Sequence, residues 1–170
     1  MLKSIMNRRS IRKFEDRPVE REKLETILRA AMQSPTAKDS RCWEFLVVTD
    51  REACEAVSQM SEFAMCAAKA PALIIPMVNL SQTSGEECWW VEDLSAATQT
   101  MLIQIEEEGL GGTWLGMYPR KSRTDALQTY FELPDHILPL AVIALGYKQK
   151  EKPQEDRWDP EKVHWEHYQK

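Results

Sequence analysis

The sequence has few of the residues, and none of the spacings, that mark several common kinds of functional site. Its 170 residues include six glycines, four cysteines and three histidines. The glycines form neither G-x-G-x-x-G before a helix nor G-x-x-x-x-G-K-[ST], which argues against a dinucleotide-binding fold and a P-loop. No G-x-S-x-G occurs, so the turn that presents a hydrolase serine is missing. The cysteines form no C-x-x-C pair, and no constellation of cysteine, histidine and carboxylate has metal-ligand spacing, so no metal site is predicted.

Long apolar runs and a strong basic balance are missing as well. The most apolar segment, residues 71–80, is far too short to span a bilayer. The N-terminal stretch carries Lys3 and Arg8 without a long apolar run, so no signal peptide is predicted. Asp and Glu outnumber Lys and Arg by 27 to 22, which argues against general nucleic-acid binding. A hydrophobic content of 43% is enough for a packed core, and we expect one soluble, cytoplasmic domain with reduced cysteines.

Hydrophobic periodicity predicts several helices. Residues 24–32 carry apolar side chains at helical spacing, and this helix must end before Pro35, because the residue preceding a proline is pushed out of the α region. Residues 51–69 are predicted to be helical in two pieces. The longest helix is predicted over residues 89–108, with Gly109 as its left-handed cap. The glutamates at 106–108 oppose the helix dipole and must be solvated or paired.

Strands are predicted over residues 43–48, 72–78, 110–115 and 137–145. The last is a nearly continuous apolar run, which is typical of a strand buried on both faces. Pro76 indicates an edge position or a bulge in the second strand. Ser122 and Asp125 have the spacing of a capping box for a helix that continues to Phe131. These elements contain no regular βαβ repeat, so they indicate an α+β fold.

The stretch around which the chain is organised is a basic run, Arg8-Arg9-Ser10-Ile11-Arg12-Lys13-Phe14. Directly before it, apolar residues at positions 2, 5 and 6 have the spacing of a short amphipathic helix. Guanidinium groups bind phosphate oxygens bidentately and a hydroxyl adds a neutral donor, so the run suits a phosphate monoester. The alternative is a solvated basic patch.

The composition changes after Gly146-Tyr147. Residues 148–157 are charged and contain proline, which is typical of an extended segment rather than of a core element. The chain beyond them carries large apolar side chains that a free tail would expose: Trp158, Val163, Trp165 and Tyr168. They need a surface to pack on, and we expect a second subunit to provide it.

The order of motifs along the chain resembles that of the FMN-dependent nitroreductase family. The resemblance begins at the basic run and continues through four further segments: Ser34-Pro35-Thr36-Ala37, Trp43-Glu44-Phe45, residues 109–116 and Val163-His164-Trp165-Glu166. It implies a mixed central β-sheet flanked by helices, in an obligate homodimer with exchanged C-terminal segments and two flavin sites at the interface. Residues 1–147 would form the flavin-binding domain, and residues 148–170 the extended segment that packs on the partner.

The same resemblance implies a set of cofactor-binding residues. The phosphate and ribityl chain would be held near the N-terminus and by one late arginine, while a loop and a glycine-containing strand would surround the ring. The full set is Arg8, Arg9, Ser10, Arg12, Pro35, Thr36, Ala37, Asp39, Thr113, Trp114, Leu115, Gly116 and Arg157. Two alternatives remain open, a plain core aromatic for Trp114 and an ordinary tail charge for Arg157.

Two of these residues take a catalytic role by resemblance. Arg12 would lie near the N1 and C2-carbonyl edge of the ring, where a fixed cation stabilises the negative charge of the reduced flavin. The backbone N–H of Leu115 would approach flavin N5. No general acid or base stands out, because the cofactor carries the hydride chemistry.

One loop departs from the family pattern. The family usually has N-x-Q-P-W where this chain has Asp39-Ser40-Arg41-Cys42-Trp43. Asp39 can accept from the flavin N3–H but cannot donate to a carbonyl as asparagine can. Arg41 replaces an amide with a cation, and Cys42 removes a proline that stiffens the loop. These changes bear on flavin affinity and on substrate preference.

The sequence thus predicts an FMN-dependent oxidoreductase that takes hydride from NAD(P)H by a ping-pong mechanism. The acceptors would be nitroaromatics, quinones or related flat, electron-poor small molecules. Reductive dehalogenation or flavin cleavage on the same scaffold is a further enzymatic alternative. A flavin-binding or redox-sensing protein with weak turnover is the alternative from a different class. The sequence leaves open the physiological acceptor and the choice between NADH and NADPH.

Overall fold

The computed structural model describes residues 1–83 and 89–168 and has the expected α+β architecture. The helices are α1 (Lys3–Asn7), α2 (Arg21–Ala31), α3 (Arg51–Gln59), α4 (Trp90–Glu107) and α5 (Lys121–Tyr130). The strands are β1 (Trp43–Val48), β2 (Ala72–Asn79), β3 (Gly111–Gly116), β4 (Ile137–Pro139) and β5 (Ala141–Gly146). Short 3-10 turns occur at Ala37–Asp39, Met65–Lys69, Leu80–Gln82 and Pro160–Lys162. The two-piece helical prediction for residues 51–69 is therefore confirmed.

The strands form one sheet in the order β1-β2-β5-β3, with β4 beside the far end of β2. Every pairing between these strands is antiparallel. In the described part of the chain, the parallel component of the expected mixed sheet is a single bridge between Ser10 and Gly112. Ser10 is one of the predicted cofactor-binding residues, and Gly112 immediately precedes the predicted residues 113–116.

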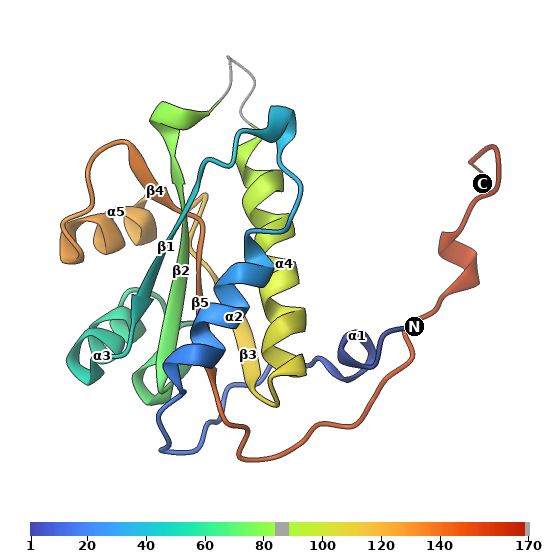
Figure 1. Cartoon of the computed structure of the whole chain (residues 1–170), viewed down its shortest axis with the longest axis horizontal. Helices are drawn as coiled ribbons and strands as arrows, with labels where there is room; N and C mark the ends of the chain where they lie inside the picture. The colour runs from blue at the N-terminus through green and yellow to red at the C-terminus, as the bar shows by residue number, and fades with distance from the viewer. Residues whose placement is uncertain (84–88, 169–170) are drawn as a thin grey trace.

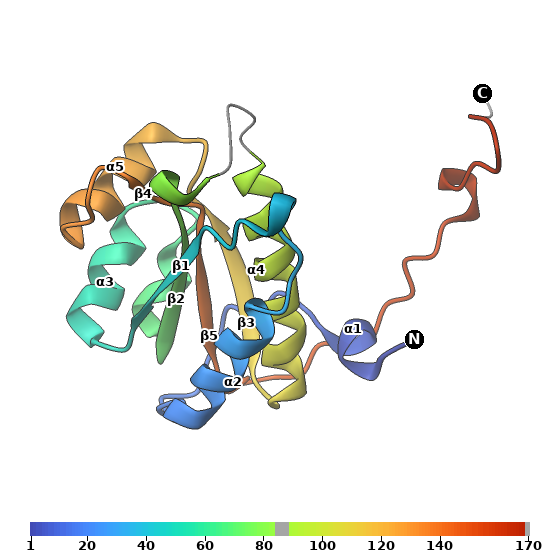
Figure 2. The same cartoon turned by 45° about the horizontal axis from the view of Figure 1, so that its top comes forward.

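Helices cover both faces of the sheet, with α2 and α4 on one side and α3 and α5 on the other (Figure 1 and Figure 2). Alternate residues of β2 supply the two cores. Ile74 packs on the side of α2 and α4, together with Ile27 and Met101. Leu73 packs on the opposite side, together with Val57 of α3. The period-two alternation of a strand thus explains why β2 is buried along its whole length.

One strand prediction needs correction, and the two alternatives for Pro76 are decided. The apolar run 137–145 is divided at Leu140, whose N–H donates to Pro76 O at 2.9 Å. Pro76 lies in an inner strand and not at an edge, but the alternative of a bulge is confirmed: between Met77↔Pro139 and Ile74↔Ile143 the register shifts by one residue. Pro76 falls between the part of β2 that pairs with β5 and the part that pairs with β4. A residue without an N–H is tolerated there because the ladder changes partner at that point.

The capping prediction for α5 is wrong. The helix begins at Lys121 with Arg120 as its N-cap and no side-chain cap, so Ser122 lies inside it. Asp125 instead accepts from Lys121 Nζ at 2.8 Å, one turn earlier in the helix. Asp125 thus forms an exposed i,i+4 ion pair with Lys121 instead of bonding to the N-terminus of the helix, as a capping box would require.

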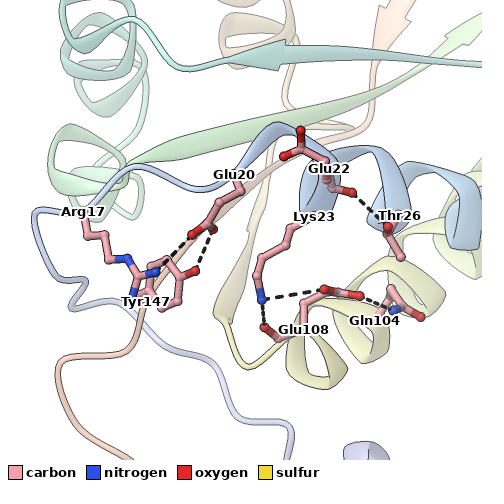
Figure 3. Close-up of polar contacts among 8 residues, drawn as sticks. All are labelled: Arg17, Glu20, Glu22, Lys23, Thr26, Gln104, Glu108 and Tyr147. Atoms are coloured by element: carbon pink, nitrogen blue, oxygen red, sulfur yellow. Dashed lines mark hydrogen bonds and ion pairs between the residues drawn. The ribbon is translucent and has the colours of Figure 1, made fainter.

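The C-terminal segment leaves the body beside the end of α4 and runs outward past α1 (Figure 1). The point where this segment leaves the body is fixed by an ion pair between Lys148 Nζ and Glu106 Oε1 at 2.8 Å. The two side chains are only 7% and 9% exposed. Burial lowers the pKa of Lys148, but the hydrogen bonds with Glu106 and Glu151 outweigh burial and raise it. Two of the three glutamates at this end of α4 are thus paired, because Glu108 forms an ion pair with Lys23 Nζ, which also donates to the Glu108 backbone carbonyl (Figure 3).

A second polar cluster joins the start of α2 to the end of β5 (Figure 3). The Tyr147 hydroxyl donates to Glu20 Oε2 at 2.6 Å, and Arg17 Nη2 donates to Glu20 Oε1 at 3.0 Å. The Arg17 guanidinium also lies 3.7 Å from the centre of the Tyr147 ring. The Tyr147 hydrogen bond, followed by a backbone hydrogen bond and Arg17, lowers the pKa of Glu20 from 4.5 to about 2.

This cluster predicts a defined acid sensitivity. Because the pKa of Glu20 is lower in the folded chain, the stabilisation is complete above pH 4.5 and is lost as the pH falls towards about 2. Between pH 4.5 and about 2, the unfolding free energy of the wild type should fall in part because Glu20 becomes protonated. We expect this contribution to be absent in Glu20→Gln, as measured by denaturant unfolding at a series of pH values. Glu22→Gln, on the same first turn of α2, should follow the wild type. A decline in Glu20→Gln as steep as in the wild type would contradict this assignment.

Candidate functional site

The parallel bridge places the N-terminal basic run beside β3. The Ile11 N–H donates to Gly112 O at 3.0 Å, which sets Ser10 against this edge strand. Arg8 lies half-buried at the C-cap of α1, immediately before the bridge. The structure therefore brings together two of the predicted groups, the basic run and residues 113–116, although more than 100 residues separate them in the sequence.

Arg9 is a largely buried cation of the basic run, with a side chain only 11% exposed. Its Nε donates to Pro153 O at 3.0 Å. Its Nη2 is buried and has no hydrogen-bond partner among the described residues. A buried donor without an acceptor costs about 1–3 kcal/mol, and more when it is charged. An anion with several acceptor oxygens, such as a phosphate monoester, would satisfy this nitrogen, so the residues present fit the predicted group.

Arg157 comes close to Arg9 in the same chain. Its Nε and Nη2 donate to Glu155 Oε2 at 3.2 and 3.0 Å. The same oxygen lies 3.6 Å from Arg9 Nη2. The C-terminal segment also places Lys152 Nζ 2.7 Å from Ser10 O. Sequence reasoning missed Lys152 and Glu155, because their alternating charges resemble those of any solvated tail.

Arg12 is exposed and lies just beyond the bridge. Burial raises the pKa of the Cys66 thiol, and the positive charge of Arg12 lowers it in part, so Arg12 lies within electrostatic range of Cys66. Two large apolar side chains of the same segment, Phe63 and Met65, are exposed. This surface was not predicted, because nothing in the spacing of residues 63–66 distinguishes it from an ordinary turn.

The hydrogen-bond pattern of β3 shows which of its N–H groups face the open edge. Gly112 turns its carbonyl outward to Ile11, whereas the Met117 N–H, five residues later, donates to Leu140 O on the β5 side at 3.2 Å. Main-chain groups alternate between the two sides of a strand. The odd-numbered residues from 111 to 117 therefore face β5, and the even-numbered ones face the open edge.

By this alternation, the N–H of Leu115 lies on the β5 side of the strand. The prediction that this N–H approaches flavin N5 remains untested, and the Gly116 N–H is the alternative donor that the ladder leaves on the open side. The Gly116 carbonyl accepts from Arg123 Nη1 at 3.0 Å. Arg123 in turn lies 5.6 Å from the centre of the Phe63 ring, which places Phe63 next to this end of β3.

Thr113 and Trp114 lie on opposite faces of the sheet. Thr113 is buried, and its Oγ1 has no hydrogen-bond partner within the described part of the chain. Trp114 is half-buried and packs against the core under α2 and α4, as the plain core alternative expected. The Thr113 hydroxyl is therefore a second unsatisfied polar group beside the basic run.

The loop from Pro35 to Asp39 lies elsewhere. Its Ala37 N–H donates to Asp93 Oδ1 at 2.8 Å, at the first turn of α4. Ser10 lies beside Gly112, beyond the opposite end of the same helix. With 18 residues, α4 is about 27 Å long. Within one chain, the loop and the basic run are thus separated by nearly the length of α4, as Figure 1 also shows.

The loop departs from the family pattern in a specific way. Asp39 accepts from Arg41 Nε and Nη2 at 2.8 and 2.7 Å, so both of its carboxylate oxygens are engaged. The Arg41 hydrogen bonds lower the pKa of Asp39. Lys38, Asp39 and Arg41 have φ angles of 54°, 53° and 46°, in the left-handed region that side chains disfavour. Thr36 Oγ1 braces the turn by accepting from the Arg41 N–H at 3.1 Å.

Asp93, in the first turn of α4, forms hydrogen bonds with this loop and was not predicted from the sequence. The carboxylate is buried and also accepts from Ser40 Oγ at 3.4 Å, in addition to the Ala37 N–H. A buried acid in the first turn of an otherwise apolar helix is the signal that could have found it. Pro35 is exposed, and Thr36 and Ala37 are half-buried, so the loop presents these residues at the surface.

Two further observations bound the chemistry. Among residues 1–83 and 89–168, no three His, Cys, Asp or Glu side chains are grouped so that they could hold a metal ion. Nor does any helix in the same ranges have the length and apolar character needed to cross a membrane. One cleft, of about 670 Å³, lies between the start of α2, the end of β1 and the start of β2. None of the predicted site residues lines it.

Comparison with known proteins bears on the whole chain. The family model described as the nitroreductase family matches residues 5–70 and 63–147. A protein of Archaeoglobus fulgidus, provisionally named NADH dehydrogenase/NAD(P)H nitroreductase, is 38% identical over 168 residues, covering 97% of both chains. A relative from Methanothermobacter thermautotrophicus with the same name is also 38% identical, covering 98% of this chain and 86% of its own. A solved structure, the FMN-dependent nitroreductase from Clostridium difficile R20291, superposes with a TM-score of 0.91 at 30% identity, covering 99% of this chain and 100% of that one.

The contacts of Asp93 generate a prediction about the loop. In Asp93→Ala, the Ala37 N–H loses its buried acceptor, so the unfolding free energy should fall by about 1–3 kcal/mol. Hydrogen exchange at the Ala37 amide should accelerate at the same time. Glu92→Ala is the control, because Glu92 is exposed on the same first turn, and its effect should stay within about 0.5 kcal/mol. Equal exchange at Ala37 in both variants would contradict this role of Asp93.

Proposed function

Because this chain belongs to the nitroreductase family, we propose that it is an FMN-dependent oxidoreductase that takes hydride from NAD(P)H and reduces flat, electron-poor acceptors. Nitroaromatics and quinones are the acceptor classes of the proposal, and the location is the cytoplasm. When bound, FMN supplies the two-electron chemistry. Donor and acceptor would use one open site in turn, which makes the proposed mechanism ping-pong.

The observation that carries the proposal is the buried Arg9 nitrogen without an acceptor, beside the edge of β3. Arg8, Arg9, Ser10 and Arg157 would hold the phosphate and ribityl chain. A guanidinium that is already fixed and largely shielded from water binds a phosphate oxygen more strongly than an exposed one does. The Pro153 carbonyl fixes the Arg9 side chain in this way.

The reactive end of the site would lie further along the same edge. Arg12 would hold positive charge near the N1 and C2-carbonyl edge of the ring, where it stabilises the charge that reduction adds. A main-chain N–H of Leu115 or Gly116 would orient the ring through N5. Thr113 and Trp114 would support this strand from its two faces.

The remaining cofactor-binding residues would come from a second copy of the chain. Pro35, Thr36, Ala37 and Asp39 lie at the other end of α4 from the basic run, so one chain cannot bring both groups to one ring. A homodimer supplies the loop from the partner. The C-terminal segment and α1 expose apolar side chains that such a partner would cover: Leu2, Ile5, Trp158, Trp165 and Tyr168.

One observation favours the alternative of a flavin-binding or redox-sensing protein with weak turnover. Arg41 bonds both oxygens of Asp39, so the flavin N3–H would have to share a carboxylate oxygen with Arg41 or displace it. A ring held less firmly would still bind through its phosphate but would turn over slowly.

The two functions are distinguished by the colour of the purified protein. Loaded with FMN, the enzyme should be yellow, should bleach anaerobically with NADH or NADPH, and should regain its colour when a nitroaromatic or a quinone is added. Colour without bleaching would support the binding protein instead. Failure of added FMN to bind would contradict both.

The role of Arg9 can be tested separately. Arg9→Ala should weaken FMN binding by about 10- to 100-fold, because it removes charge-assisted hydrogen bonds worth roughly 1.5–3 kcal/mol. Riboflavin, which lacks the phosphate, should bind both proteins equally, as judged by quenching of flavin fluorescence. Arg29→Ala, an exposed arginine of α2, serves as the control. A loss of affinity that is the same for FMN and riboflavin would refute a phosphate contact at Arg9.

A further inference from the structure

Two arginines from opposite ends of the chain converge on one carboxylate oxygen. Glu155 Oε2 accepts both hydrogen bonds from Arg157, at 3.0 and 3.2 Å, and lies 3.6 Å from Arg9 Nη2. A single anionic atom thus stands between the two guanidinium groups proposed to bind the cofactor phosphate. The second oxygen, Oε1, takes part in none of these contacts.

The carboxylate fills this position incompletely. Its distance to Arg9 Nη2 is beyond hydrogen-bond length, and this nitrogen has no acceptor in the part of the chain that the structure describes. The terminal group of a phosphate monoester carries three acceptor oxygens, so it can bond both guanidinium groups at once. Glu155 and Arg157 are 62% and 63% exposed, and an ion pair so open to water is weak and readily displaced.

The backbone around Glu155 is held independently of its carboxylate. Arg9 Nε donates to Pro153 O, Lys152 Nζ donates to Ser10 O, and Gln154 bonds Asn7. These contacts fix residues 152–154 against the end of α1. The carboxylate can therefore swing away while the segment, and Arg157 with it, stays beside the basic run.

We propose that Glu155 is a specificity-determining residue of the flavin site, an internal counter-anion that a cofactor phosphate must displace. The proposal rests on the function proposed above. In the chain without cofactor, Glu155 compensates the charge of Arg9 and Arg157. Its negative charge lowers the affinity for phosphate esters and leaves the affinity for a neutral flavin unchanged. Glu155 thus sets how strongly the site prefers FMN over riboflavin.

The experiment measures dissociation constants for FMN and for riboflavin by flavin fluorescence, with wild type, Glu155→Gln and Glu155→Ala. Glu161→Gln is the matched control, because it removes the same charge from the same segment at an exposed residue that no ion pair holds in the described structure. Removing the counter-anion should tighten FMN binding about fivefold in both Glu155 variants, in line with a displaced ion pair of up to about 1 kcal/mol. Riboflavin binding should not change in any of them, nor FMN binding in Glu161→Gln.

Each other result has a definite meaning. Unchanged or weaker FMN binding by Glu155→Gln, with the wild type still binding FMN, overturns the role of Glu155 and leaves the proposed function standing. Equal tightening in Glu161→Gln also overturns it, because the effect would then be one of net charge. If the wild type binds no FMN, the proposed function fails and the role of Glu155 falls with it. Equal melting temperatures of the variants establish that folding is not the cause of a difference.

Discussion

The pairing of the N-terminal run with the outer edge of β3 is the constraint on which the rest of the candidate site depends. The hydrogen bond from Ile11 to Gly112 puts Ser10 and its arginines next to the strand, and the two segments approach very closely there. A Cβ atom at Gly111 would lie 2.6 Å from Ile11 Cγ1 and 2.7 Å from Lys148 Cγ, so only glycine allows this contact. Glycine at position 111 is thus a packing requirement of the site.

The same region controls where the C-terminal segment goes. Lys148 leaves β5 beside Gly111 and is held by Glu106 in a pair that is almost fully buried. The chain then passes Arg9, which accounts for the proximity of Arg157 to the basic run. The contacts of Lys148 and Arg9 therefore set both the direction of the C-terminal segment and the proximity of Arg157 to the basic run. Exposed aromatic residues beyond this point leave the single chain with surface that a partner can cover.

Much of the fold could be predicted, because it depends on local patterns. The apolar stripe of α2, the length of α4 and the stop before Pro35 follow from spacing within one or two turns. The errors arose where a distant segment decided the outcome. Pro76 indicated either an edge position or a bulge, and only the pairing of β2 with strands far along the chain decided for the bulge. The candidate site divides in the same way: the cationic run was found from its composition, whereas Asp93, Phe63 and Glu155 were not.

The sequence alone determined the identity of the elements and the chemistry available to them: amphipathic helices, apolar strands, a cationic run and an aromatic tail. The tertiary structure alone decided which of these groups meet. It turned the Leu115 N–H towards β5, placed Glu155 between Arg9 and Arg157, and set the loop at Ala37 at the far end of α4 from Ser10. The physical reason is that side-chain pattern reports the interactions of residues a few positions apart. Contacts between residues as distant as Arg9 and Pro153, 144 positions apart, depend instead on how the whole chain packs.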